Sequence, residues 1–348
     1  MNKHSLKRMR AYLDDPIIDS QIGQLVESAM LSDEPELYRE LITNIIRLGQ
    51  NQPHRADLKL FIRAFRDLRH ANRVFSKYKH AKKITIFGSA RTAPDRPEYA
   101  AAHDFAKAMA ESGFMIITGA GNGIMGAAQD GAGCDRSFGL NIVLPFEQSP
   151  NTTINNDPKL VTFNYFFTRK LHFIKESHAI VCFPGGFGTM DESFEALTLM
   201  QTGRSNLVPI IFMDAPGGGF WKPFEDYLNR ELLRRGLISH EDMHLFKITD
   251  SLEDAQNEIF NFYKNFHSYR FVKENLVIRM QRQIPESAVT DIEHDFADIC
   301  TKDKVHVCHA LPEEIDEPEI SHLPRLRLPF NRRMLGRLRL LINRINEF

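Results

Sequence analysis

The chain has 348 residues, and its acidic and basic side chains nearly balance, for a formal net charge of -1. That length fits one α/β core with additions, or two domains. The near-neutral charge gives no overall attraction to nucleic acid or to a membrane. Four cysteines are too few for a disulfide framework, which favours a reducing, cytoplasmic compartment. The basic N-terminus has no apolar segment behind it, so we expect neither a signal peptide nor a membrane span.

Residues 1–80 have a helical pattern. Apolar residues recur every three or four positions in two segments, at Leu37, Leu41, Ile45 and Leu48 and again at Leu58, Phe61, Phe65 and Leu68. Ser32 is placed to cap the first of these helices, and Pro53 separates the two. Because no glycine-rich turn or titratable cluster occurs here, we interpret residues 1–80 as a helical N-terminal extension.

Residues 81–266 alternate between short β-rich runs and helix-like segments. The runs are ITIF, FMIIT, NIVL, AIVCF and VPIIFM, at 84–87, 114–118, 141–144, 179–183 and 208–213. Alternation of this kind indicates βαβ units and a parallel sheet. The runs are continuously apolar, as in strands that are covered on both faces. We therefore predict an α/β fold with a doubly wound, Rossmann-like parallel sheet, a nucleotide-binding core between helical N- and C-terminal extensions.

Residues 267–348 form the C-terminal extension. An acidic segment at 312–319 precedes a basic amphipathic tail. The tail has an apolar stripe of Met334, Leu338, Leu341 and Ile345, with Arg333, Arg337 and Arg344 on a neighbouring face. Such a tail can dock on a membrane or a nucleic acid. We favour packing on the protein's own core or on a second subunit, with the tail facing the acidic segment before it.

Three of the predicted strands end in small, flexible turns. These turns are 87–91 with Gly88, Ser89 and Arg91, then 118–126, then 184–189. Carboxyl ends of parallel strands share one edge of the sheet, where ligands bind. Glycines let the backbone approach a ligand, and each following helix directs its free N–H groups at the same place. Three such turns on one edge predict a phosphate site.

The second turn contains a GxGxxG pattern, at Gly121, Gly123 and Gly126. A dinucleotide site also needs an acidic residue at the end of the next strand, to hold the ribose hydroxyl. The run at 141–144 contains Asn141 and has no acid at its end. This disfavours an NAD-dependent oxidoreductase and favours a mononucleotide, and we expect no organic cofactor.

The third turn is the most specific motif of the chain. Residues 184–192 read PGGFGTMDE, which resembles the PGGxGTxxE motif of the Lonely Guy (LOG) family. Arg169 and Lys170 resemble the family's Arg-Lys pair, and Gly123 to Gly126 resembles its GxMG element. The resemblance covers residues 82–266 and neither extension. Many members carry the label lysine decarboxylase, but the chain has no recognisable pyridoxal-lysine motif.

The resemblance implies a phosphoribohydrolase, which cleaves a nucleoside 5′-monophosphate to free base and ribose 5-phosphate. Glu192 is then the catalytic carboxylate, because an oxocarbenium-like ribosyl cation needs a nearby negative charge. Arg169 is the second catalytic candidate. Each acid or base also has a purely structural interpretation. Glu192 can form a capping box with Thr189, and Arg169 can be an ordinary surface residue. Asp191 is interpreted as an acid of the first helical turn that the helix dipole favours, not as a catalyst.

The remaining candidates bind phosphate or substrate. They are Gly88, Ser89, Gly119, Gly121, Gly123, Met125, Lys170, Gly185, Gly186, Gly188 and Thr189, with Arg91 either a contact or a solvated loop residue. Cys300, His306, Cys308 and His309 match no strong zinc pattern, so we expect no metal. We expect a homodimer or higher homo-oligomer, and neither nucleic acid nor membrane as partner. The alternative from another class is a nucleotide-binding regulator or carrier that does no chemistry.

Overall fold

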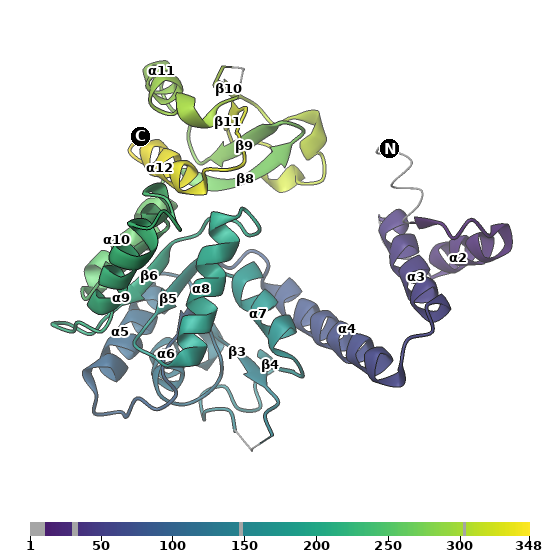
Figure 1. The fold of residues 1–348 in the computed structure, drawn as a ribbon, viewed down its shortest axis with the longest axis horizontal. Helices are drawn as coiled ribbons and strands as arrows, with labels where there is room; N and C mark the ends of the chain where they lie inside the picture. The colour runs from purple at the N-terminus through teal and green to yellow at the C-terminus, as the bar shows by residue number, and fades with distance from the viewer. Residues whose placement is uncertain (1–10, 30–33, 146–148, 302–303) are drawn as a thin grey trace. The chain divides into compact units, whose positions relative to one another are not determined.

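The computed structural model describes residues 11–29, 34–145, 149–301 and 304–348 (Figure 1). The chain divides into two compact units, Met1–Arg66 and Asp67–Phe348. The first unit holds α2 (Pro16–Ser28), α3 (Pro35–Gln50) and the start of α4 (Arg55–Phe75). Both predicted apolar repeats lie on helices, one on α3 and one on α4. Ser32, the predicted cap, lies outside the described residues.

The second unit is built on a seven-stranded sheet in the order β4-β3-β2-β1-β5-β6-β7, and every neighbouring pair is parallel. Its strands are β1 Lys83–Phe87, β2 Met115–Thr118, β3 Ser137–Ile142, β4 Leu160–Phe163, β5 Ala179–Cys182, β6 Ile210–Met213 and β7 Phe246–Thr249. Its helices are α5 Pro97–Glu111, α6 Ile124–Ala132, α7 Phe166–Lys175, α8 Phe187–Gln201, α9 Lys222–Tyr227 and α10 Leu252–Phe262. The predicted doubly wound α/β core is confirmed.

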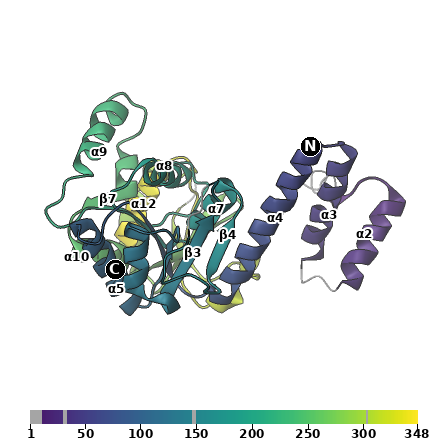
Figure 2. The same ribbon diagram turned by 90° about the horizontal axis from the view of Figure 1, so that it is seen from below.

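Both faces of this sheet are covered (Figure 2). Ile84 and Ile86 of β1 pack in one apolar cluster with residues of α5, α6 and α10. Phe87, which points to the other face, packs in a second cluster with residues of α7 and α8. Alternate residues of a strand point to opposite faces, so both sets must be apolar, which produces the continuous runs seen in the sequence.

Three strands differ from the sequence prediction. The third strand is Ser137–Ile142 rather than 141–144, and β4 and β7 were not predicted. Both unpredicted strands lie at the edges of the sheet, and both are short, LVTF and FKIT. An edge strand keeps polar side chains toward solvent, so its apolar run is broken and its pattern is weak.

The C-terminal extension is not purely helical, and this part of the prediction is wrong. It forms an antiparallel sheet in the order β10-β11-β9-β8. Its elements are β8 Phe266–Val272, β9 Asn275–Met280, α11 Glu286–Asp295, β10 His306–Cys308, β11 Arg325–Leu328 and α12 Leu335–Ile345. The strand pattern is obscured because Arg279 in β9 and Arg325 in β11 are buried where an apolar residue is expected.

The two buried arginines pair with the carboxylate of Glu314. This carboxylate lies 2.8 Å from Arg279 Nη2 and 3.3 Å from Arg325 Nε, and all three side chains are buried. Arg270 of β8 contacts Asp316 and Glu317, each at 2.8 Å. The acidic segment therefore pairs with arginines of the sheet, not with the tail that we expected it to face. Paired in this way, the buried charges satisfy one another.

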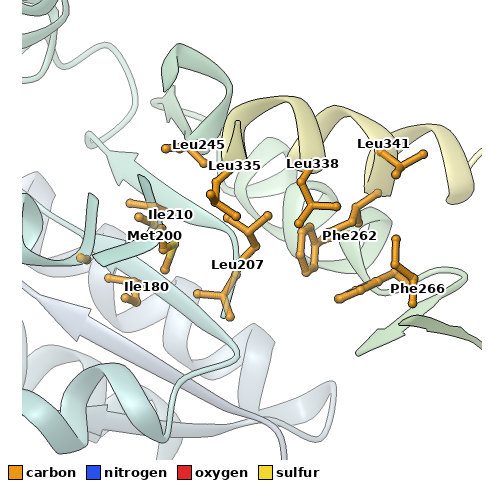
Figure 3. Packing of buried hydrophobic residues seen from close by; sticks show 14 of the residues in the cluster. Ile180, Met200, Leu207, Ile210, Leu245, Phe262, Phe266, Leu335, Leu338 and Leu341 are labelled. Carbon is orange, nitrogen blue, oxygen red and sulfur yellow. The ribbon is translucent and has the colours of Figure 1, made fainter. Parts of the chain in front are cut away.

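The tail forms α12, which packs on its own protein. Leu338, Leu341 and Ile345 are fully buried, and Figure 3 shows Leu338 and Leu335 directed toward Phe262 and Leu207. Asn346 Oδ1 accepts hydrogen bonds from the backbone N–H groups of Asn265 and Phe266, both at 2.8 Å. The predicted packing on the core is confirmed. None of the described helices has the length and apolar character that a bilayer span requires.

Short helices fill the connections of this unit. The 3-10 helices are η1 Ser76–Tyr78, η2 Cys134–Arg136, η4 Glu241–Leu245, η5 Ala297–Ile299, η6 Pro312–Glu314 and η7 Pro318–Ile320, and η3 Leu228–Leu233 is a π-helix.

Replacing Leu341 by Ala tests whether α12 belongs to the core. Leu341 is fully buried, so its loss removes apolar contacts and leaves a cavity. We expect the free energy of unfolding to fall by about 2–5 kcal/mol, measured by urea denaturation. Leu237→Ala is the matched control, because that leucine is 65% exposed. Equal, small effects of the two changes would contradict the packing of α12 on the core.

Candidate functional site

A cavity of about 800 Å³ opens at the carboxyl ends of the central strands. It lies where the strand order reverses, since β1 pairs with β2 on one side and with β5 on the other. The chain continues from β1 to β2 on one side and from β5 to β6 on the other. The connections that leave the adjacent strands β1 and β5 therefore run in opposite directions, which opens a crevice at this point of a doubly wound sheet. The three glycine turns meet at this crevice.

Ten of the predicted site residues line the cavity. They are Gly88, Ser89, Gly119, Met125, Arg169, Gly185, Gly186, Gly188, Thr189 and Glu192. Arg91, which the sequence left open, lines it as well. Gly121, Gly123 and Lys170 do not. Lys170 Nζ instead lies 2.9 Å from Asp191 and 2.6 Å from Glu195, so it is engaged with carboxylates of α8.

Gly123 does not line the cavity but has a structural role in the turn. It adopts a φ of 63°, and a Cβ at this position would clash with the backbone oxygen of Ser89. The next residue, Ile124, donates its N–H to that same oxygen at 3.0 Å, and Ser89 N–H donates to Pro184 O at 3.0 Å. Gly123 thus allows the second turn to pack on the first, and Ser89 links the first to the third.

The third turn leads directly into α8. The N-cap is Gly186, with no side-chain hydrogen bond, and the first helical bond runs from Met190 N–H to Gly186 O at 3.1 Å. The N–H groups of the first turn are therefore available at the cavity. A Cβ on Gly186 or Gly188 would meet no protein atom within 4 Å, so open space faces both glycines. These features together suit an anion.

The capping-box alternative for Glu192 does not hold. That interpretation needs Thr189 at the N-cap, but α8 already begins at Phe187. Thr189 is the third residue of the helix, and Glu192 lies one turn further along. Asp191 is likewise not a first-turn acid, and its carboxylate pairs with Lys170. Glu192 is thus free of a capping role and lines the cavity.

Arg169 is buried, with 9% of its surface exposed, so the surface alternative is also wrong. Its Nε donates to Leu140 O at 2.7 Å and its Nη2 to Gly119 O at 3.4 Å. A Cβ on Gly119 would clash with that Nη2, so a larger residue at this position would displace the guanidinium. The guanidinium also lies 5.0 Å from the ring centre of Phe173.

Glu192 has a strongly perturbed pKa. Burial raises the pKa of this carboxyl group to about 7, although the residue keeps some contact with solvent through the cavity. The positive charges of Arg169 and Lys170 oppose the increase, whereas the negative charges of Asp191 and Glu195 add to it. Burial also lowers the pKa of Arg169, and the charge of Glu192 opposes that change. A carboxyl group that titrates near neutral pH in a cavity is typical of catalytic sites.

Sequence reasoning missed the apolar wall of the cavity. The unpredicted lining residues are Phe87, Ala90, Asn141, Ile142, Leu144, Phe166, Phe173, Phe187 and Met190. A signal was present for two of them. Phe166 and Phe173 stand three residues before and four after Arg169, a spacing that places all three on one helix face.

Within the part of the chain that the structure describes, no three His, Cys, Asp or Glu side chains are grouped to hold a metal ion. His306 and Cys308 lie on β10, in the C-terminal sheet. Asn141 lines the cavity, and β3 ends at Ile142 without an acid. The expectation that NAD does not bind at the second turn stays a prediction.

Similar structures include two proteins of molybdenum cofactor biology. The molybdenum cofactor binding protein of Rippkaea orientalis has a TM-score of 0.35 and 21% identity, over 52% of this chain and 96% of that one. The molybdenum cofactor carrier protein of Chlamydomonas reinhardtii has a TM-score of 0.37 and 15% identity, over 52% of this chain and 99% of that one.

The core also matches known sequences. Residues 125–259 match the family model described as possible lysine decarboxylase. A cytokinin riboside 5′-monophosphate phosphoribohydrolase of Mycobacterium tuberculosis is 28% identical over 149 residues, which is 42% of this chain and 78% of that relative. The family-model match falls on the α/β core, and it includes the PGGxGTxxE motif and the Arg-Lys pair. The two comparisons support the resemblance of the α/β core to the LOG family.

Proposed function

We propose that this protein hydrolyses the N-glycosidic bond of a nucleoside 5′-monophosphate and releases free base and ribose 5-phosphate. The observation that carries the proposal is the placement of Arg169 and Glu192 in one cavity with the anion-binding start of α8. The charges of these two side chains influence each other, as their pKa shifts reveal. The name of the mycobacterial relative fits the same reaction.

The phosphate would bind at the start of α8. The free N–H groups of the first turn donate to its oxygens, and the helix dipole favours its negative charge. Thr189 and Ser89 can add hydroxyl contacts, because both line the cavity. Glu192 lies one helical turn beyond this position, three residues after Thr189, so a ribose attached to the phosphate extends toward its carboxylate.

The reaction needs a negative charge next to C1′. As the bond from C1′ to the base nitrogen breaks, positive charge develops on the ribose, and ionised Glu192 stabilises it. Water then adds to C1′ and gives one proton to Glu192, whose pKa of about 7 suits that exchange. The bond electrons go to the base, and the proton taken up by Glu192 passes to the base through solvent, so the carboxylate is restored and the net reaction consumes one water. Arg169 orients the phosphate or a ribose hydroxyl.

The base would lie against the apolar wall. Phe166 and Phe187 are exposed, at 56% and 97%, although both line the cavity. Large exposed aromatic rings beside a polar centre offer a flat base a surface to stack on.

A panel of nucleoside monophosphates tests the proposal. We expect the purified protein to release free base from at least one of them, detected by chromatography. Ribose 5-phosphate should appear in equal amount, which distinguishes hydrolysis of the glycosidic bond from loss of phosphate. A protein that binds a monophosphate but releases no base from any of them would belong to the class of binding regulators or carriers.

The activity should depend on pH through Glu192. The working form is the carboxylate, so kcat/KM should rise with pH and level off above a midpoint near pH 7. The substrate phosphate has its own ionisation near pH 6. Glu192→Gln should lose the limb near 7 and keep only the phosphate limb in its residual activity. Activity that falls as pH rises through 7 would mean that the neutral acid is the working form.

A further inference from the structure

We infer that Asp67 of α4 is a positioning residue for Arg169, an inference that rests on the proposed function. Asp67 lies outside the family match at 125–259, in the segment before the sheet. Its carboxylate is bound to the start of α7, the helix that carries Arg169. Asp67 thereby fixes where the guanidinium stands in the cavity.

Three hydrogen bonds join Asp67 to the start of α7. Asn164 donates its backbone N–H at 2.8 Å and its side-chain amide at 2.7 Å. Thr168 donates its hydroxyl at 3.0 Å. All three donors lie within five consecutive residues, and Asp67 itself is 4% exposed. One buried carboxylate thus holds both sides of the helix start.

Helix α7 has no cap of its own. Its N-cap is Tyr165, whose side chain makes no capping hydrogen bond. The positive end of the helix dipole favours a negative charge at this place, and Asp67 supplies it from α4. No lysine or arginine of the described residues forms an ion pair with Asp67 (the ion pairs of the unit involve other carboxylates). Its negative charge is therefore directed at the helix start.

Arg169 depends on the position of α7. It follows Thr168 directly, and its guanidinium is held by two backbone carbonyls, those of Leu140 and Gly119. The contact with Gly119 O is long, at 3.4 Å. A small shift of the helix start would break it and move the charge away from Glu192. Displacements of about 1 Å in a catalytic site can cost roughly a hundredfold in rate.

The experiment compares Asp67→Ala and Asp67→Asn with Asp57→Asn, an exposed acid on the same helix. Asp67→Ala should lower kcat/KM about tenfold or more. The loss should divide between kcat and KM in the same proportion as the loss in Arg169→Ala does. Asp67→Asn keeps the size of the side chain and should lose less. Asp57→Asn should match the wild type.

A double-mutant cycle identifies the route of the effect. If Asp67 acts through Arg169, Asp67→Ala should change nothing further in the Arg169→Ala background. The acid limb of the Asp67→Ala variant, the part of its pH profile in which kcat/KM rises, should also move to higher pH. Arg169 opposes the rise of the Glu192 pKa, as Lys170 does, whereas Asp191 and Glu195 add to that rise. Additive losses, or an unmoved acid limb with only a lower melting temperature, would overturn the inference.

A readout without substrate separates this inference from the proposed function. The Nε–H of Arg169 donates to Leu140 O, so its NMR signal should exchange slowly with water in the wild type and in Asp57→Asn. In Asp67→Ala the exchange should be at least about tenfold faster. A wild type that releases no base refutes the proposed function alone. Unchanged exchange in Asp67→Ala refutes the role of Asp67.

Discussion

Glu192→Gln should lower kcat on a nucleoside monophosphate by about a hundredfold or more. The substitution keeps the size of the side chain but removes the negative charge that faces the ribosyl cation. Affinity for the phosphate should change little, because the start of α8 is untouched. Steady-state release of base measures kcat, and calorimetry with ribose 5-phosphate measures the affinity.

The same variant should be as stable as the wild type or more stable. The ordinary pKa of a glutamate is 4.5, and burial raises that of Glu192 to about 7. A group with a raised pKa stabilises the fold below its unfolded value, and that contribution is lost as pH rises through the folded value. At pH 8 the charged carboxylate therefore opposes folding, and glutamine does not. The difference in melting temperature should be largest at pH 8 and shrink toward pH 4.5.

Glu195→Gln is the matched control for this prediction. Glu195 lies on the same helix, three residues further on, and pairs with Lys170 outside the cavity. Its replacement should leave kcat within about threefold of the wild type, since a partly exposed pair contributes little. Equal losses in the two variants, or near-normal turnover in Glu192→Gln, would remove Glu192 from the mechanism.

The second large effect concerns the phosphate. Adenosine should react at least about a hundredfold more slowly than AMP, in kcat/KM, if AMP is a substrate. The phosphate does not react, but its binding at α8 holds the ribose against Glu192 and Arg169. Removing it should therefore lower turnover as well as affinity. Parallel assays of the two compounds at several concentrations separate kcat from KM.

Gly186→Ala probes the same contact from the side of the protein. A methyl group at Gly186 meets no protein atom within 4 Å, so the fold should tolerate it. It would occupy space in the cavity where the phosphate is expected, and KM for the monophosphate should rise. Gly219→Ala is the control, because that position is also open and lies outside the cavity lining. Equal rates for AMP and adenosine would contradict a phosphate site at α8.

Local patterns in the sequence were sufficient for the α/β class of the core and for the glycine-turn side of the cavity, but not for its apolar wall. Glycine turns follow strands within a few residues, and parallel strands place their carboxyl ends on one edge. This predicted that Gly88, Gly119 and Gly185 would meet, which the cavity confirms. The PGGxGTxxE motif identified Glu192 as a candidate, and the Arg-Lys pair identified Arg169. Both are recognised from neighbouring residues in the sequence, without knowledge of distant contacts.

Only the tertiary structure decided the roles that depend on surroundings. Whether Arg169 is a surface or a buried residue, and whether Glu192 caps a helix, depends on where α7 and α8 begin and on what covers them. The C-terminal sheet was hidden because Arg279 and Arg325 appear polar in the sequence, and only the fold shows that Glu314, 35 and 11 residues away, pairs with both. Asp67 meets Thr168 across 101 positions of sequence. Periodicity reports neighbours along the chain, whereas desolvation and charge act through space, so burial and pKa emerge only when the chain has folded.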